Sequence, residues 1–384
     1  MMKTTSSNEP LRILCVVGAR PNFIKISPLM RAFRARADEF DARLVHTGQH
    51  FDAAMKAAFF QQLNIPEPDV DLGVGGGSHA VQTAQIMLRF EPVIDEFSPH
   101  VVLVVGDVNS TLACALVAGK KQVAVVHVEA GLRSFDRAMP EEINRLLTDQ
   151  IADLLFTTER DAVDNLLREG VAEAKIHEVG NVMIDTLISH RTDAVPSADT
   201  LQRIAAGRGA IGRFGVLTLH RPSSVDDPET LKHLVRLFVE LSEKLPLVFP
   251  VHPRTHQRLQ AAGLLEQLLA SGIVVAEPLG YLEMLGLMLD AELVITDSGG
   301  LQEETTALGV PCLTIRENTE RPITVSEGTN TVVGVDEAAI RTEFDRVLTT
   351  GGKRGRVPAL WDGNAAGRIA DILLEWASKQ RKAA

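Results

Sequence analysis

Short, fully apolar runs that alternate with helix-length segments constrain the fold of this chain more than any other feature. Val101–Val105 and Val123–Val126 contain only apolar residues. A strand with one solvated face alternates apolar and polar residues, so these runs predict strands that are buried on both faces. Such strands, separated by helices, indicate parallel sheets covered by helices, and the predicted fold class is therefore α/β.

The alternation occurs in both halves of the chain. A chain of 384 residues is longer than a single domain with one hydrophobic core usually is. Expected strands begin near Leu11, Ala42, Val101, Val123, Leu154 and Ile176 in the first half, and near Phe214, Leu247, Ile273, Leu293 and Pro311 in the second. Residues 191–212 lack strong periodicity, which places the boundary between roughly 180 and 212. We therefore predict two Rossmann-like parallel-sheet domains facing a central cleft, at 1–180 and 181–364. A last helix at 365–384 is expected to pack back across the first domain.

Charge and cysteine content narrow the functional classes. With 39 basic and 50 acidic residues, the net charge of −11 argues against a general nucleic-acid surface, so an anionic ligand must be met by a local cluster. Cys15, Cys114 and Cys312 lie in expected strands or a helix, as small buried residues do. The sequence shows neither a signal core nor a run of roughly 18 apolar residues, so we expect a soluble, cytoplasmic protein.

Two carboxylates follow successive apolar strands in the first half. Asp107 follows Val101–Val105 and one glycine, and Glu129 follows the run that begins at Val123. Successive parallel strands usually lie side by side, which predicts both carboxylates at one edge of the sheet, where ligands bind. The same residues also fit a helix cap at Asp107 and a solvated Glu129.

A helix is expected to begin at Pro140, because proline is favoured at the first helical position. Glu141 and Arg145 are four residues apart, which predicts that one helix face presents a carboxylate together with a guanidinium, beside Asn144. A surface ion pair has the same spacing.

Cations occupy other expected strand ends. Arg20 and Lys25 flank the loop after the first strand, where cations and backbone amides meet phosphate in many proteins. His220 and His252 follow two strands of the second half. A chance pair of cations and hydrogen-bonded structural histidines remain the alternatives.

The stretch Asp297-Ser-Gly-Gly300 turns an expected strand into a helix. Glycine allows backbone amides to approach a phosphate, and a helix N-terminus adds partial positive charge. Glu304, just over one turn later, is placed to accept both hydroxyls of a ribose. A plain turn followed by an acidic helix explains the same residues.

Together these stretches resemble the non-hydrolysing UDP-N-acetylglucosamine 2-epimerase family, from about Leu11 to Trp376. The motifs that carry the resemblance are Gly18-Ala-Arg-Pro-Asn-Phe-Ile-Lys25, Gly106-Asp107, His127-Val-Glu-Ala-Gly-Leu-Arg133, Pro140-Glu-Glu-Ile-Asn-Arg145, His220-Arg221, Asp297-Ser-Gly-Gly300 and Thr319-Glu-Arg-Pro322. The resemblance implies the two-domain GT-B architecture. It also implies a homodimer with a UDP-sugar as substrate, without cofactor, metal, nucleic acid or membrane.

The resemblance also implies roles for individual residues. The acid, base and leaving-group roles correspond to Asp107, Glu129, Glu141 and His220. The substrate and UDP contacts correspond to Arg20, Lys25, Arg145, His252, Ser298, Gly299, Gly300, Glu304 and Arg321.

The chain departs from the best-known bacterial pattern of that family. His220-Arg-Pro-Ser-Ser replaces the more usual Arg-Arg-Glu-Ser after the histidine, and the stretch from Arg133 to Glu141 is shorter. In some relatives Gln49, His50 and His252 would help bind a second, activating UDP-sugar, but Gly75-Gly-Gly-Ser-His79 lacks the arginine that accompanies them.

The implied reaction interconverts UDP-N-acetylglucosamine and UDP-N-acetylmannosamine by anti elimination of UDP to a 2-acetamidoglycal and re-addition. The alternatives are the same reaction on a UDP-2,3-diacetamido uronic acid, a hydrolysing epimerase, a GT-B glycosyltransferase and a UDP-sugar-binding protein without catalytic activity.

Overall fold

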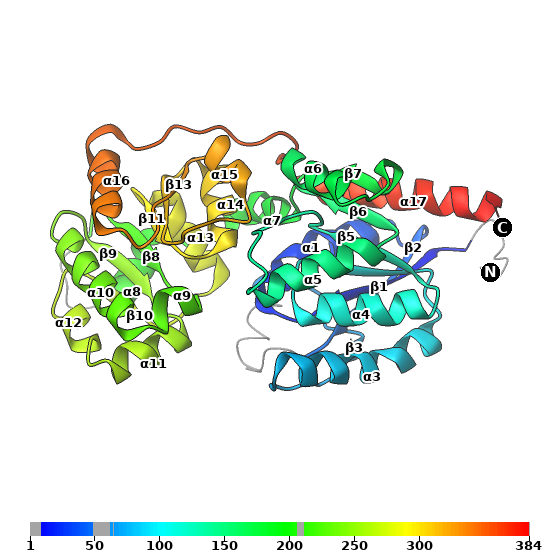
Figure 1. Ribbon diagram of the computed structural model, residues 1–384. Coiled ribbons are helices and arrows are strands. Elements are labelled where there is room, and N and C mark those ends of the chain that lie inside the picture. The colour runs from blue at the N-terminus through cyan, green and yellow to red at the C-terminus, as the bar shows by residue number, and fades with distance from the viewer. Residues whose placement is uncertain (1–8, 49–61, 64, 206–210, 384) are drawn as a thin grey trace. The chain divides into compact units, whose positions relative to one another are not determined.

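The computed structural model describes residues 9–48, 62–63, 65–205 and 211–383 (Figure 1). The chain forms two compact units: unit 1 comprises Met1–Ser189 and Ala359–Ala384, and unit 2 comprises His190–Pro358. Each unit is built around one sheet in which every pair of neighbouring strands is parallel. The predicted α/β class with two parallel-sheet domains is confirmed.

The described part of unit 1 contains a seven-stranded sheet in the order β3-β2-β1-β4-β5-β6-β7. Its strands are β1 (Leu11–Val17), β2 (Phe40–His46), β3 (Val70–Asp71), β4 (Val101–Val105), β5 (Ala124–Val128), β6 (Leu154–Thr157) and β7 (Ile176–Glu178). All five residues of β4 are buried, as its apolar run predicts for a central strand covered on both faces. The two-residue edge strand β3 was not predicted.

Helices connect and cover the strands of unit 1 (Figure 1). They are α1 (Arg20–Arg34), α3 (His79–Phe97), α4 (Asn109–Lys120), α5 (Pro140–Ile151), α6 (Arg160–Arg168), α7 (Val182–His190, its last residue in unit 2) and α17 (Ala365–Ala383). The predicted start of α5 at Pro140 is confirmed, and its N-cap residue, Met139, makes no side-chain cap. Cys15, Cys114 and Cys312 are buried, in β1, in α4 and in strand β12 (Cys312–Thr314) of unit 2.

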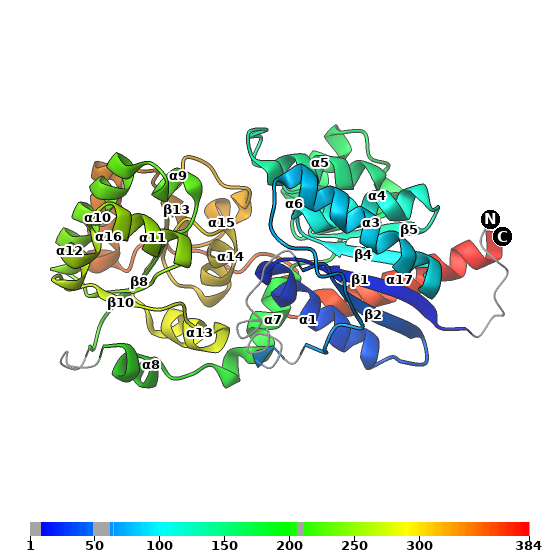
Figure 2. The same cartoon turned by 90° about the horizontal axis from the view of Figure 1, so that it is seen from below.

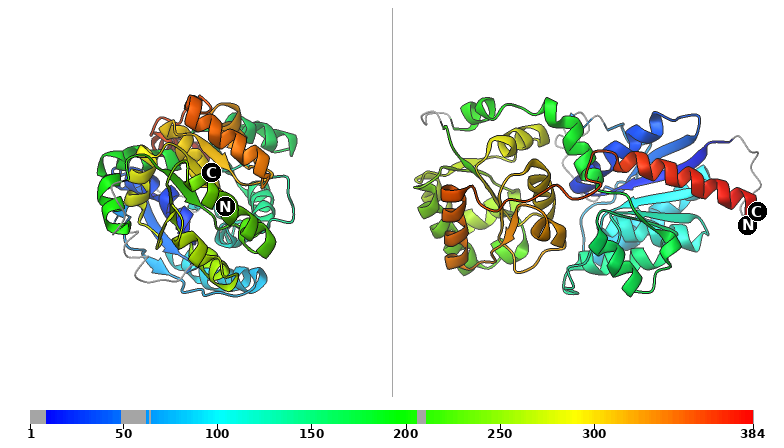
Figure 3. Two further views of the ribbon diagram at one scale, coloured as in Figure 1. Left: turned by 90° about the vertical axis from the view of Figure 1, so that its left-hand side faces the viewer. Right: turned by 90° about the horizontal axis from the view of Figure 1, so that it is seen from above.

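The C-terminal helix α17 belongs to unit 1 and packs against α1. Asp185 accepts hydrogen bonds from the backbone N–H groups of Ala365 and Ala366, which are otherwise unsatisfied at the start of a helix. Near the other end of α17, the Arg381 guanidinium donates to the carbonyl of Glu9, just before β1. Figure 3 (right) shows the C-terminal helix, in red, lying along unit 1. Both ends of α17 are therefore tied to unit 1.

Unit 2 contains a sheet in the order β10-β9-β8-β11-β12-β13. Its strands are β8 (Gly215–Thr218), β9 (Leu247–Pro250), β10 (Val274–Ala276), β11 (Val294–Thr296), β12 (Cys312–Thr314) and β13 (Asn330–Val332). Its helices are α8 (Ser197–Ile204), α9 (Pro222–Val225), α10 (Pro228–Ser242), α11 (Pro253–Ala261), α12 (Leu265–Leu269), α13 (Tyr281–Asp290), α14 (Gly299–Leu308), α15 (Pro322–Ser326) and α16 (Glu337–Thr350). Strand β13 was not predicted, and α8, which lies beside α13 in Figure 2, occupies a segment in which we expected no regular element.

Both sheets share one topological feature that locates their ligand sites. In unit 1 the chain order reverses between β1 and β4, and in unit 2 it reverses between β8 and β11. At such a switch point the loops leave the sheet on opposite faces, and open α/β sheets bind ligands outside the carboxyl ends of these strands.

No helix in the described ranges combines the length and apolar character of a membrane span.

Candidate active site

A buried ion pair joins Lys25 of α1 to Glu129, which follows β5. Lys25 Nζ lies 2.5 Å from Glu129 Oε2, and both side chains are at most 6% exposed. Glu129 has a φ of +70°, an uncommon backbone conformation for a residue with a side chain. Conformations of this kind concentrate at functional sites because the surrounding structure must hold them.

Arg145 of α5 links two carboxylates. Its Nη1 lies 2.5 Å from Asp107 Oδ2, and its Nη2 lies 2.6 Å from Glu142 Oε2. Glu142 also accepts the backbone N–H groups of Ser134 and Phe135, each at 3.0 Å. Burial opposes the ionisation of Glu142, but the N–H of Ser134 and the Arg145 guanidinium outweigh it and lower the pKa of this carboxyl.

This arrangement disagrees with two of the alternative interpretations of the sequence. No ion pair between Glu141 and Arg145 occurs among the described side chains, because Arg145 turns to Glu142 and Asp107 instead. The alternative that Asp107 caps a helix is also wrong, since the N-cap of α4 is Val108 and makes no side-chain cap. Strands β4 and β5 are hydrogen-bonded neighbours, so Asp107 and Glu129 follow adjacent strands as predicted.

At the switch point of unit 2, His220 pairs with Asp297. His220 Nδ1 lies 2.8 Å from Asp297 Oδ1, and the same carboxylate accepts the backbone N–H groups of His220 and Arg221. Burial opposes the ionisation of Asp297, but the contact with His220 lowers its pKa. A fully buried, charged Asp297 therefore orients a partly exposed imidazole. The His252 ring lies 5.8 Å from the His220 ring.

Helix α14 begins at Gly299 with Ser298 as its N-cap, and the Ser298 side chain makes no cap hydrogen bond. The first turn of α14 therefore keeps N–H groups that an anion can bind. A Cβ on Gly299 would lie 3.0 Å from Glu320 Oε1, so this position is sterically tight. The predicted Ser298-Gly299-Gly300 turn thus lies at a helix start, next to a carboxylate that was not predicted.

Three arginines surround Glu320. Arg316 Nη2 lies 2.7 Å and Arg221 Nη2 lies 3.4 Å from its oxygens, and Arg321 pairs with Glu303 at 2.7 Å. Burial opposes the ionisation of Glu320, but the charges of Arg321, Arg316 and Arg221 hold its pKa far below the usual range. Arg221 Nε and Arg316 Nη1 are buried and make no hydrogen bond to the described part of the chain. A net positive cluster with buried donors is suited to an anion such as a diphosphate.

Glu304 lies fully inside unit 2, where the Tyr281 hydroxyl donates to its Oε1 at 3.0 Å. Burial raises the pKa of Glu304 to about 7, although the Tyr281 hydrogen bond acts in the opposite direction. This carboxyl therefore changes charge near neutral pH.

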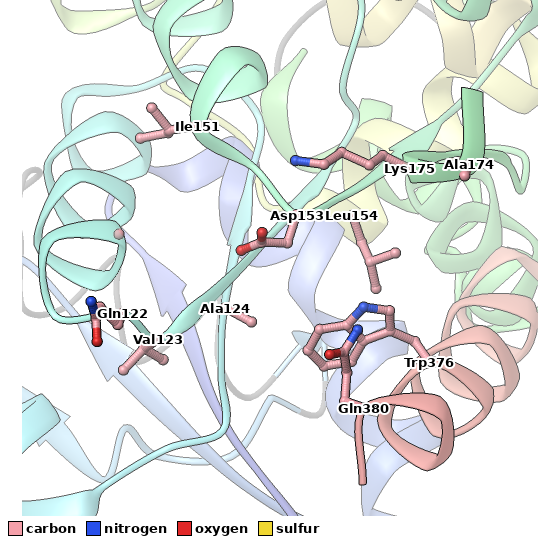
Figure 4. A pocket seen from close by; sticks show the side chains of 11 residues that line it. Gln122, Val123, Ala124, Ile151, Asp153, Leu154, Ala174, Lys175, Trp376 and Gln380 are labelled. Carbon is pink, nitrogen blue, oxygen red and sulfur yellow. The ribbon is translucent and has the colours of Figure 1, made fainter. Parts of the chain in front are cut away.

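Other predicted residues lie elsewhere. Gln49, His50 and the side chain of Arg20 are outside the described part of the chain. A groove of about 610 Å³ lies in unit 1. Lys175 and Trp376 are among the side chains that line it (Figure 4). The groove lies at the amino ends of β5 and β6, the edge opposite Asp107 and Glu129, and contains none of the predicted site residues.

Comparison with known proteins decides the family. The sequence profile of UDP-N-acetylglucosamine 2-epimerase matches residues 32–374. The chain belongs to the UDP-N-acetylglucosamine 2-epimerase family. Enzymes of this family are isomerases, so the predicted family and enzyme class are both confirmed.

Relatives within the epimerase family cover nearly the whole chain. The UDP-N-acetylglucosamine 2-epimerase of Methanococcus maripaludis is 40% identical, over 94% of this chain and 98% of its own. A UDP-2,3-diacetamido-2,3-dideoxy-D-glucuronate 2-epimerase of Pseudomonas aeruginosa is 42% identical, over 94% of this chain and 99% of its own. The structure of the Methanocaldococcus jannaschii UDP-GlcNAc 2-epimerase in complex with UDP-GlcNAc and UDP matches with a TM-score of 0.87 and 40% identity, covering 94% of this chain and 99% of that one.

Proposed function

We propose that this epimerase-family chain interconverts UDP-N-acetylglucosamine and UDP-N-acetylmannosamine. The observation that carries the proposal is the pair of carboxylates, Asp107 and Glu129, held beside cations at the carboxyl ends of adjacent strands. Unit 2 separately offers an anion-binding feature, a cluster of arginines near the start of a helix that begins with glycine. Family membership supports a homodimer in the cytoplasm as the working form.

The proposed chemistry follows from the substrate. Carbon 2 of the sugar is not adjacent to a carbonyl, so its proton is too weakly acidic for simple removal and return. In an elimination, a carboxylate takes that proton, the C–H electrons form the carbon 1–carbon 2 double bond, and the carbon 1–oxygen bond breaks toward UDP. Re-addition of UDP with protonation on the opposite face inverts carbon 2.

Individual residues receive roles in this proposal. Asp107, Glu129 and Glu141 act as acid and base groups, and His220, oriented by Asp297, assists departure of the diphosphate. The arginines around Glu320 and the start of α14 stabilise the negative charge of released UDP. Glu304 accepts the ribose hydroxyls. Lys25, Arg145 and Arg321 keep the cationic roles that the resemblance implies.

One observation supports a UDP-linked diacetamido uronate as an alternative substrate. The Pseudomonas aeruginosa relative named for a diacetamido uronate is as similar to this chain as the relatives named for UDP-N-acetylglucosamine. The same elimination applies to both sugars, because the substituents at carbons 3 and 6 take no part in it.

Solvent deuterium tests the proposed reaction. UDP-N-acetylglucosamine is incubated with the protein in heavy water, without acceptor, metal or nicotinamide, and the products are separated and examined by NMR. We expect UDP-linked N-acetylmannosamine with deuterium at carbon 2, since the abstracted proton exchanges before the opposite face is protonated. Free sugar would indicate a hydrolase. Epimerised UDP-sugar without deuterium would exclude a base whose proton exchanges with solvent. The same assay is repeated with the UDP-linked diacetamido uronate, and turnover of that sugar alone would make it the substrate.

The charge of Glu304 predicts a pH dependence for substrate binding. A carboxylate accepts two ribose hydroxyls in charge-assisted hydrogen bonds, whereas protonation removes the charge and turns one of its oxygens into a donor, which weakens both bonds. Because the pKa of Glu304 lies at about 7, affinity is expected to fall as the pH drops below 7, roughly tenfold per unit. Calorimetric titration with UDP-N-acetylglucosamine measures it, since its esterified diphosphate does not titrate in this range. Glu304→Gln should bind more weakly and without this dependence, and an unchanged pH profile in that variant would assign the titration to another group.

A further inference from the structure

His127 lies two residues before Glu129 and contacts Gly106, the residue before Asp107. None of the roles above uses it. It lies in β5 and is completely buried. Its Nδ1 lies 2.6 Å from Asp149 Oδ1, and its Nε2 lies 2.8 Å from the carbonyl oxygen of Gly106. A carbonyl oxygen only accepts hydrogen bonds, so Nε2 carries a proton.

The partner at Nδ1 also only accepts. Asp149 contacts Arg133 at 2.7 Å and accepts the backbone N–H of Gly131. Burial opposes its ionisation, but the Arg133 guanidinium lowers the pKa of Asp149 and the Gly131 N–H requires an acceptor, so the carboxylate is charged. Nδ1 must then carry a proton as well, and the ring is an imidazolium.

The charges around the ring agree with this protonation state. Arg133 also forms two hydrogen bonds with Glu169, at 2.8 and 2.6 Å. An imidazolium and Arg133 supply two positive charges against the two negative charges of Asp149 and Glu169. A neutral His127 would leave one uncompensated negative charge in this group, in which only Glu169, with its side chain 26% exposed, is partly solvated.

The hydrogen bond from His127 to the Gly106 carbonyl helps to set the direction in which the Asp107 side chain points. His127 holds the oxygen of Gly106, and Asn144 Nδ2 donates to the carbonyl oxygen of Asp107 at 2.8 Å. Because peptide groups are planar, these two bonds fix the peptide planes on both sides of the Asp107 Cα, and hence the direction of its Cβ. Arg145 then binds the carboxylate end.

We infer that His127, as a buried imidazolium, and Asn144 are positioning residues that hold the Asp107 carboxylate in its reactive place. The inference rests on the proposed function, in which Asp107 is an acid or base group. A displacement of about 1 Å at a reacting group lowers rates by about 100-fold.

Two substitutions test the hydrogen bonds of the two ring nitrogens of His127 one at a time. In His127→Asn the amide reaches the place of Nδ1, so the bond to Asp149 is kept and the bond to Gly106 is lost. In His127→Gln the amide reaches the place of Nε2, so the Gly106 bond is restored. We expect H127N to melt below the wild type, because the buried charge of the imidazolium is lost, and to show a kcat lowered about 100-fold with KM little changed. H127Q should also melt below the wild type, but its kcat should be rescued toward that of the wild type. His100→Asn controls for histidine loss in the same unit.

A purely structural role would lower the melting temperature of both variants and leave kcat per folded molecule unchanged, and that result overturns the inference. Nitrogen-15 NMR of histidine-labelled wild-type protein tests the imidazolium without kinetics, with the signal assigned by its absence from H127N. Two protonated ring nitrogens support the inference, and a single one overturns it. If the wild-type protein fails to epimerise either UDP-sugar, the proposed function fails, whereas the NMR result still decides the protonation state.

Discussion

Asp107→Asn is expected to lower the turnover of UDP-N-acetylglucosamine by roughly 10²- to 10⁴-fold, the usual effect of losing a positioned acid or base. Glu129→Gln and Glu141→Gln should have effects of the same size. The asparagine amide cannot exchange a proton with carbon 2, but it keeps the size of the side chain. Arg145 also retains its bonds to Glu142, so the fold should be preserved. Initial rates of product formation, together with thermal melting of each variant, measure the two effects.

Asp95→Asn is a matched control for this series. Asp95 is a carboxylate of the same unit that pairs with Lys121 on the surface, where the side chain is 61% exposed. Its loss should change neither turnover nor melting appreciably. If Asp107→Asn, Glu129→Gln and Glu141→Gln all turn over at the rate of Asp95→Asn, these carboxylates are structural and the assignment is wrong.

Arg145→Met is expected to lower the free energy of unfolding by about 3–5 kcal/mol, because it leaves a buried carboxylate without its cation. Arg145 is among the largest fully buried side chains, and Glu142 is 2% exposed. The double variant Arg145→Met with Glu142→Gln should recover part of the loss, since the remaining side chain is neutral. Both tryptophans, Trp361 and Trp376, lie in unit 1, so tryptophan fluorescence during urea unfolding reports on the unit that contains Arg145.

The stability effect of Arg145→Met should depend on pH in a definite direction. The pKa of Glu142 is lowered in the folded protein, chiefly by the Ser134 N–H and Arg145 acting against burial. A group of this kind stabilises the fold above its unfolded pKa, and the contribution disappears as the pH falls through the folded pKa. The difference between wild type and variant should therefore be complete at neutral pH and shrink in acid.

Arg160→Met is the matched control, because Arg160 pairs with Asp164 in the same unit but is 68% exposed. Its loss should cost under about 1 kcal/mol. An Arg145→Met variant as stable as Arg160→Met would show that the buried cluster contributes nothing net.

The strands could be predicted wherever burial makes a strand continuously apolar. The central strand β4 is an apolar run with no alternation, because helices cover both faces of a parallel sheet. The strands that escaped prediction, β3 and β13, are short and lie at the edges of their sheets. Edge strands have one neighbour and need less apolar surface, so their composition resembles that of loops.

The positions of Asp107, Glu129, His220 and Ser298 could also be predicted, because parallel strands all end at the same edge of their sheet. The sequence alone therefore determined the fold class and the residues that follow the strands. It could not determine the partners of those residues. Residues three and four apart share one helix face, so both Glu141 and Glu142 satisfied the spacing to Arg145.

Only the tertiary structure chose among these partners. The loop at Ser134 and Phe135 donates its N–H groups to Glu142, which turns that carboxylate, rather than its neighbour, toward Arg145. Likewise, His127 and Asp149 are 22 residues apart, and each looks ordinary within its own element. Hydrogen bonds between side chains on different elements depend on how those elements pack, and packing distances are not encoded in local spacing.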